Sequence, residues 1–169
     1  TAGMALDYDA IAAKAAGRIN RAVIAEEMVH LGYCESVKDA FSGYLKVGGG
    51  YYVPPLRPDA FETIRFIKSL GCAAVLAHPF LNLSRQELEV FLPQAVEAGL
   101  DGMEVLYSKY SPEETAESFE LIEKYGLLPS GGSDYHGGNK PHIQMGVGQG
   151  NLAVPQAWMT ELETRARKI

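Results

Sequence analysis

Hydrophobic positions in the first third of the chain recur at helical spacing. Over 7–16 and again over 19–31, apolar side chains stand three or four positions apart, which predicts two amphipathic helices. Ser36 with Asp39 fits the cap of a third helix that runs to Leu45. The glycines and prolines within 48–55 then predict a loop. Pro58 suits the first turn of a further helix that ends near residue 71.

From residue 72 onwards the pattern changes to short apolar runs that alternate with amphipathic helices. Ser84 with Glu87, and Ser111 with Glu114, have the spacing of capping boxes, and Pro155 is placed to begin a last helix. Strands alternating with helices are typical of parallel βα units, so the sequence predicts an α/β fold. The predicted strands cover 72–77, 102–106 and 127–130.

Composition and charge narrow the class of protein. The 169 residues suit one domain, or one domain with a small appendage, and the net charge is -6. The basic residues cluster only in the tail at 165–168, which excludes an extended nucleic-acid surface but allows a small anionic substrate. The longest apolar run, 72–77, is too short to span a bilayer. Two cysteines without metal-ligand spacing favour free thiols and a cytoplasmic protein.

The start of the chain has neither an initiator Met nor the features of a signal peptide. We therefore expect it to be part of a longer protein.

Residues with catalytic chemistry follow each predicted strand. His78 comes after the first strand, Glu104 and Tyr107 belong to the second, and Asp134 and His136 follow the third. Because parallel βα folds place their sites at the carboxyl ends of the strands, we expect these residues at one rim. Asp134 and His136, two apart in an extended segment, would point the same way. With His78 they would form a His/Asp/His metal site with an open position for water.

The alternative interpretation of the same residues is structural. An Asp in a glycine-rich turn commonly caps a helix, and a His before a Pro commonly ends a strand. We interpret Glu104 as a carboxylate that supports the ligands without binding metal itself. Among the remaining histidines, His30 fits a solvated helix position and His142 a loop. The tyrosines at 44, 51 and 52 are predicted to pack inside the protein or between its domains.

Three segments resemble the PHP (polymerase and histidinol phosphatase) domain, in particular its TrpH/YciV-type phosphoesterases: Ala73–Pro79, Gly102–Val105 and Gly132–His136. The resemblance implies a distorted (β/α)7 barrel with a helical insertion. Residues 1–70 would be mostly the insertion and 71–169 the second part of the barrel. It further implies two or three divalent ions (Mn, Zn or Fe), with ligands at His78, Asp134 and His136. The substrates would be phosphate esters of nucleotides or short oligonucleotides.

The chain also departs from the family's pattern. The opening His-x-His motif, which would supply further ligands, is absent and would be expected before Thr1. Arg21 matches an arginine of the insertion and is expected, with Tyr135 and Lys140, to contact phosphate. Tyr110 stands where a His is frequent in the family.

Three functional hypotheses remain open. The first is a metal-dependent phosphoesterase that acts through metal-activated water. The second is a catalytically incomplete fragment that binds metal or phosphate weakly, with activity residing in a longer parent protein. The third is a barrel metallohydrolase acting on amides. Unpaired strand edges in an incomplete barrel predict either a homo-oligomer or pairing with a missing N-terminal segment.

Overall fold

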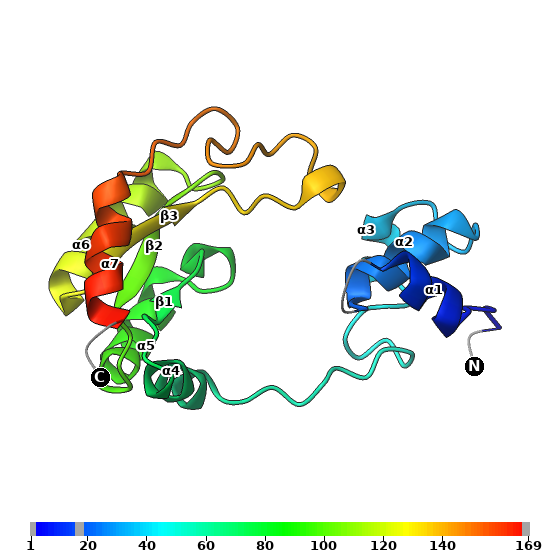
Figure 1. Ribbon diagram of the computed structural model, residues 1–169, viewed down its shortest axis with the longest axis horizontal. Helices are drawn as coiled ribbons and strands as arrows, with labels where there is room; N and C mark the ends of the chain where they lie inside the picture. The colour runs from blue at the N-terminus through cyan, green and yellow to red at the C-terminus, as the bar shows by residue number, and fades with distance from the viewer. Residues whose placement is uncertain (1–2, 16–18, 167–169) are drawn as a thin grey trace. The chain divides into compact units, whose positions relative to one another are not determined.

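The computed structural model describes residues 3–15 and 19–166 and divides into two compact units, Thr1–Arg57 and Pro58–Ile169 (Figure 1). The N-terminal unit is helical, and the C-terminal unit contains the sheet. The predicted α/β class is therefore confirmed. In the described part of the chain, no helix has the length and hydropathy of a bilayer span.

The N-terminal unit contains three short helices, each begun by a side chain that accepts backbone N–H groups. Asp7, Asn20 and Ser36 are the N-caps of α1, α2 and α3, as expected of short polar residues at these positions. Residue 16, the predicted end of the first helix, lies outside the described residues. The helices are α1 (Tyr8–Lys14), α2 (Arg21–His30) and α3 (Val37–Ser42). Their small core is formed by Ala25, Met28, Cys34, Ala40 and Leu45.

In the C-terminal unit, four helices pack around a parallel sheet of order β1-β2-β3 (Figure 1). A bulge between Glu104 and Leu106 shifts the register of β2 against β3. Both capping boxes are present, at Ser84 and at Ser111. The elements are α4 (Ala60–Ser69), β1 (Val75–Leu76), the 3₁₀ turn Pro79–Leu81, α5 (Arg85–Glu97), β2 (Gly102–Tyr107), α6 (Pro112–Tyr125), β3 (Leu128–Gly132), the 3₁₀ turn Gly137–Asn139 and α7 (Gln156–Ala166).

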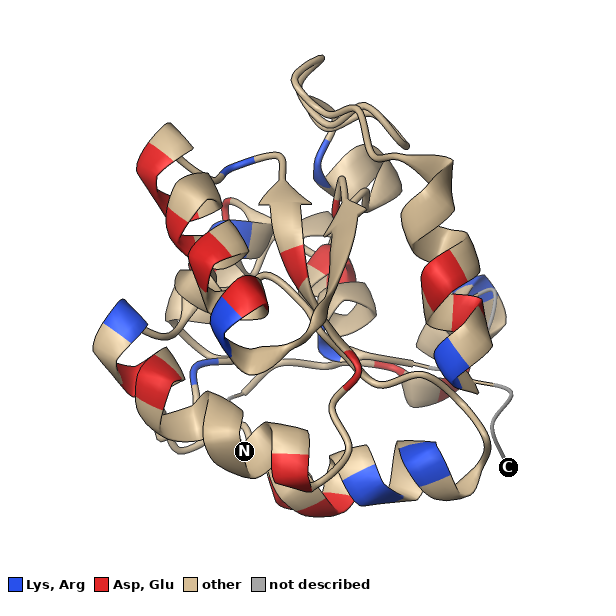
Figure 2. Ribbon diagram, turned by 90° about the vertical axis from the view of Figure 1, so that its left-hand side faces the viewer, with Lys and Arg blue, Asp and Glu red and all other residues tan. Residues whose placement is uncertain are grey.

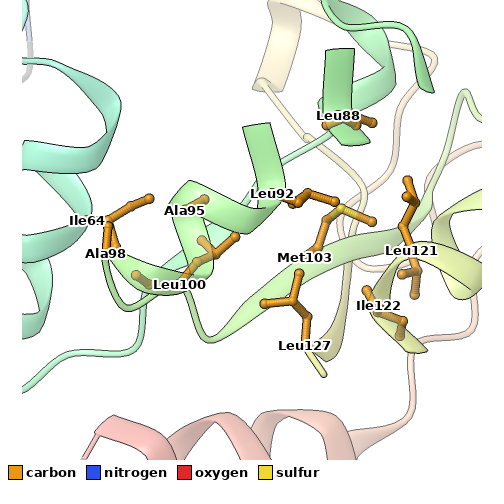
Figure 3. Close-up of a cluster of buried hydrophobic side chains, with 12 residues drawn as sticks. Ile64, Leu88, Leu92, Ala95, Ala98, Leu100, Met103, Leu121, Ile122 and Leu127 are labelled. Atoms are coloured by element: carbon orange, nitrogen blue, oxygen red, sulfur yellow. The ribbon is translucent and has the colours of Figure 1, made fainter. Parts of the chain in front are cut away.

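The core of the C-terminal unit forms where α4, α5 and α6 pack on the central strand (Figure 3). Met103 and Val105 lie on one face of β2 and are fully buried, and Glu104 between them is buried on the other face, as is typical of a central parallel strand covered on both faces. Leu88 and Leu92 of α5 meet Leu121 of α6 in the same cluster. Charged residues lie mostly on the helices, whereas the strands are largely uncharged (Figure 2).

The structure corrects element bounds that the sequence predicts; the third helix, for example, ends at Ser42 and not at Leu45. Pro58 precedes α4, because the Asp59 carboxylate accepts the N–H groups of Phe61 and Glu62 and begins the helix at Ala60. The first strand has only two residues, Val75–Leu76, and Ala74 O just before it accepts the N–H groups of Asp101 and Gly102.

The second compact unit begins at Pro58 and includes α4. Ile64 of α4 is buried in the core of the C-terminal unit. Lys68 Nζ lies 2.7 Å from Asp101 Oδ2 at the start of β2. These contacts make α4 part of the α/β unit.

Candidate functional site

The carboxyl ends of the three strands bring together the predicted residues that follow them. The His78 N–H donates to Glu104 Oε2 at 2.6 Å. The ring centroids of His78 and Tyr107 lie 5.4 Å apart. The Tyr107 hydroxyl in turn donates to Asp134 Oδ2 at 3.1 Å. His78, Glu104, Tyr107 and Asp134 therefore form one connected group, as the strand pattern predicts.

His78 has an unusual backbone and an unpaired ring nitrogen. Its φ of 31° lies in the left-handed region, which is uncommon for a residue other than glycine, and it begins the turn at Pro79–Leu81. Its Nδ1 atom is buried and meets no hydrogen-bond partner among the described residues. A buried polar atom without a partner is costly in a folded protein, and functional sites are a common place for one.

Glu104 is a buried carboxylate that holds this turn. Only 8% of it is exposed, and burial raises the pKa of its carboxyl, against the opposing effect of the His78 N–H. Its position requires a glycine opposite, because a Cβ on Gly132 would lie 2.8 Å from Glu104 Oε1. Glu104 therefore connects β2 to the end of β1 and packs closely against β3.

The Asp134 carboxylate accepts hydrogen bonds from two side chains, Lys140 and Tyr107. Its φ of 54° is also left-handed, and its Oδ2 lies 2.5 Å from Lys140 Nζ. Partial burial acts to raise the pKa of this carboxyl, but the hydrogen bonds from Lys140 and Tyr107 outweigh burial and lower it. Burial first, and then the hydrogen bond to Asp134, raise the pKa of Tyr107 to about 12. Asp134 is therefore held ionised by two donors.

His136 lies beside Asp134 on an exposed part of the loop. Its Nδ1 is 2.7 Å from Asp134 O and 3.4 Å from Asp134 Oδ1. Because Nδ1 is engaged, Nε2 is the ring nitrogen that a metal would take. His136 and Asp134 thus supply imidazole and carboxylate donors of the kind that transition metals bind.

The candidate metal ligands are nevertheless not all close together in the part of the chain that the structure describes. Within residues 3–15 and 19–166, no three His, Cys, Asp or Glu side chains are grouped closely enough to hold a metal ion. Asp134 and His136 are neighbours, whereas the His78 ring packs against Tyr107, whose hydroxyl donates to Asp134. His78, Asp134 and His136 carry nitrogen and oxygen donors of the kind that a divalent metal accepts, although the described residues do not group three of them.

The other predicted site residues lie in different surroundings. Tyr135 is 46% exposed, next to the two candidate ligands. Arg21 belongs to the N-terminal unit, where its guanidinium lies between the rings of Phe41 and Tyr52, 4.7 and 4.8 Å from their centroids. Of the remaining histidines, His30 is exposed on α2 and His142 lies in a loop, as predicted. The hydroxyl of Tyr110 accepts the Phe80 N–H at 3.2 Å, and burial raises its pKa.

Sequence reasoning missed two roles in this group. The sequence pattern places Tyr107 at the rim but assigns it no function, and it assigns no role to Gly132 by itself. A signal for Tyr107 existed, because it is the last residue of its strand and its hydroxyl can reach the next one. Gly132 had no local signal, since the atom it must avoid is 28 residues away in the chain, on Glu104.

Comparisons with known proteins identify relatives that are named as enzymes acting on phosphate esters. No family model matches the chain. The Escherichia coli (strain K12) 5′-3′ exoribonuclease Rnm is 33% identical over 158 residues, which are 90% of this chain and 54% of that protein. The phosphoribosyl 1,2-cyclic phosphate 1,2-diphosphodiesterase of Eggerthella lenta is 40% identical over 87 residues, 50% of this chain and 32% of that protein.

Two solved structures have a fold similar to that of this chain. A Bifidobacterium adolescentis protein assigned as a metal-dependent phosphoesterase has a TM-score of 0.75 and 29% identity, covering 96% of this chain and 57% of that one. A Chromobacterium violaceum amidohydrolase, solved with sulfate and without metal, has the same TM-score at 25% identity, covering 97% and 58%. The chain thus spans about half the length of the proteins it resembles.

Proposed function

Because the chain belongs to the PHP family of phosphoesterases, we propose that it contributes to the hydrolysis of phosphate esters of nucleotides or short oligonucleotides by metal-activated water. On this proposal the N-terminal unit is the helical insertion, and the unit from Pro58 onwards belongs to the barrel. The protein would act in the cytoplasm on a small phosphorylated substrate.

The observation that supports this function most is the set of contacts around Asp134. A left-handed carboxylate residue, held ionised by Lys140 and Tyr107 and next to an imidazole, provides negative charge and nitrogen donors at the end of a parallel strand. The unpaired Nδ1 of His78 adds a further donor at the neighbouring strand end. We propose that His78, Asp134 and His136 bind metal, Mn, Zn or Fe, in a complete site of two or three ions.

A divalent metal bound there would lower the pKa of water to produce hydroxide and would neutralise charge on the phosphoryl oxygens. The residues of this chain prepare the site. Glu104 holds the backbone of His78, and Tyr107 orients Asp134. Lys140 already places an ammonium beside Asp134, where it would bind a phosphoryl oxygen. Arg21 and Tyr135 are the further candidates for contact with phosphate.

A second candidate function has a specific observation in its favour. The described residues bring no three metal-binding side chains together, so this chain by itself would hold metal weakly and would depend on ligands from outside it. Such ligands would come from a second copy of this chain or from a segment that corresponds to the unmatched part of its relatives. This candidate keeps the hydrolase activity in the longer parent protein.

Metal content separates the two candidates. Elemental mass spectrometry on the 169-residue chain, purified without chelator, should give two or more transition-metal ions per chain if the site is complete. The double variant Asp134→Ala/His136→Ala should lose them, whereas His142→Ala, which removes an exposed histidine of the same loop, should keep them. Less than about one ion per chain would favour the incomplete fragment.

Activity is then tested with a 3′,5′-bisphosphorylated nucleoside as substrate and Mn²⁺ present. The proposal expects phosphate release that EDTA abolishes. Lys140→Met should reduce it, and Lys109→Met, which removes an exposed lysine near the end of β2, should not. Metal-loaded chain without any phosphate release would reject the enzymatic proposal for this chain.

A further inference from the structure

Two tyrosines of the N-terminal unit form an exposed pair. Tyr44 is 37% exposed and Tyr51 is 58% exposed, and their ring centroids lie 5.6 Å apart at an interplanar angle of 57°. The sequence predicts that these rings pack inside the protein or between its domains; within their own unit, both rings lie at the surface. In the segment that pairs Val47 with Tyr52, the Tyr52 ring covers Arg21, whereas the Tyr51 ring meets Tyr44 at the surface.

The segment that carries the pair is held in place from within its own unit. The Arg21 guanidinium lies between Phe41 and Tyr52, and its Nη1 donates to Leu45 O at 3.3 Å. Arg21 of α2 thus contacts one residue that precedes Tyr44, Phe41, and one that follows Tyr51, Tyr52. A ligand that stacks on the pair would therefore meet side chains whose backbone is already ordered, which lowers the entropic cost of binding.

The electrostatic surroundings of the pair differ from the rest of the chain. Residues 40–58 contain no Asp or Glu, although the chain as a whole has a net charge of -6. The same segment contains Lys46 and Arg57, both exposed. Gly48 and Gly50 have positive φ and open space where a Cβ would lie, so a ligand can approach the backbone between the two tyrosines. Exposed aromatic rings in a segment that carries two cations and no acids suit a ligand with bases and phosphates.

We infer that Tyr44 and Tyr51 form a stacking surface for the bases of single-stranded RNA, with Lys46 contacting the phosphate backbone. Bases stack on aromatic side chains regardless of sequence, and a lysine two residues from Tyr44 supplies the charge that a phosphodiester needs. Two rings can stack on only one or two bases. A contact of this size does not require an extended basic surface. The choice of RNA rests on the proposed function, but the binding itself requires neither metal nor hydrolysis.

The test is fluorescence anisotropy with a short, fluorescein-labelled oligoadenylate, measured in EDTA so that no hydrolysis occurs. Tyr51→Ala and Tyr44→Ala should each weaken binding about tenfold, within the range of base stacking on aromatic residues. Tyr51→Phe keeps the ring and should bind like the wild type. Lys46→Gln should reduce the dependence of affinity on salt, because about one counterion fewer is released.

Tyr8→Ala is the matched control, since Tyr8 is a 70% exposed tyrosine of the same unit that lies on α1 between two aspartates. It should leave the affinity unchanged. Wild-type affinity in both Tyr44→Ala and Tyr51→Ala, or competition by inorganic phosphate as effective as that by adenosine monophosphate, would overturn the inference. Ring-dependent binding in EDTA without any phosphate release in Mn²⁺ would reject the proposed function alone. Phosphate release together with ring-independent binding would reject this inference alone.

Discussion

Replacing Gly132 by Ala tests how Glu104 is held at the strand ends. The added Cβ would lie 2.8 Å from Glu104 Oε1, where ordinary contact begins at 3.4 Å. Glu104 has little room to move, because it is 8% exposed and its other oxygen accepts the His78 N–H at 2.6 Å. Relief of the overlap would lengthen that hydrogen bond or displace β3. We expect the free energy of unfolding to fall by about 1–3 kcal/mol, as for other overpacked sites.

Urea unfolding, followed by tryptophan fluorescence, measures the change in the free energy of unfolding of the C-terminal unit. The chain has one tryptophan, Trp158, which lies on α7 and packs against Phe119 with ring centroids 6.2 Å apart. Its signal therefore reports on the C-terminal unit. Gly138→Ala is the matched control, because nothing lies within 4 Å of its added Cβ and its φ is not in the left-handed region. The control should change the free energy by less than about 0.5 kcal/mol.

A double-mutant cycle with Glu104→Ala isolates the overlap from other effects of the new methyl group. In the Glu104→Ala background the carboxylate is gone, so Gly132→Ala should cost much less than in the wild type. The difference between the two costs is the interaction between the positions. The reasoning fails if Gly132→Ala is as mild as Gly138→Ala, or if its cost is the same in both backgrounds.

The remaining predictions concern the core, a helix cap and the candidate metal ligand. Leu92→Ala, at a fully buried position, should lower the free energy of unfolding by about 2–5 kcal/mol in the same urea assay, whereas Val90→Ala, 70% exposed, should not. Ser111→Ala removes the N-cap of α6 and should cost about 1 kcal/mol; an unchanged urea midpoint would contradict that role. Lys140→Met removes the ammonium that competes for the Asp134 carboxylate, so calorimetry should show tighter Mn²⁺ binding, and weaker binding would refute the competition.

Local interactions explain which features could be predicted from the sequence. The caps at Ser84 and Ser111 each depend on an acidic side chain three residues later, and α6 ends at Gly126 because glycine adopts the left-handed φ of 66°. The alternation of strands and helices likewise predicts the parallel sheet and the rim on which His78 and Asp134 lie.

Contacts between distant residues explain what could not be predicted. Residues 54–71 contain no signal that α4 packs with the sheet, because its partner Asp101 is 33 positions from Lys68. Tyr52 packs on Arg21 of α2, far away in the chain, while its neighbour Tyr51 is exposed.

The sequence by itself determined the element types, the caps and the residues with metal-binding chemistry, since each depends on neighbours within one helical turn or on the order of strands. Only the tertiary structure decided that Glu104 holds the His78 backbone, that Lys140 and Tyr107 share Asp134, and that Gly132 must lack a side chain. The physical reason is distance along the chain. Hydrogen bonds and steric exclusion act over a few ångströms, and these atoms come within that range only when separate strands and loops are packed together.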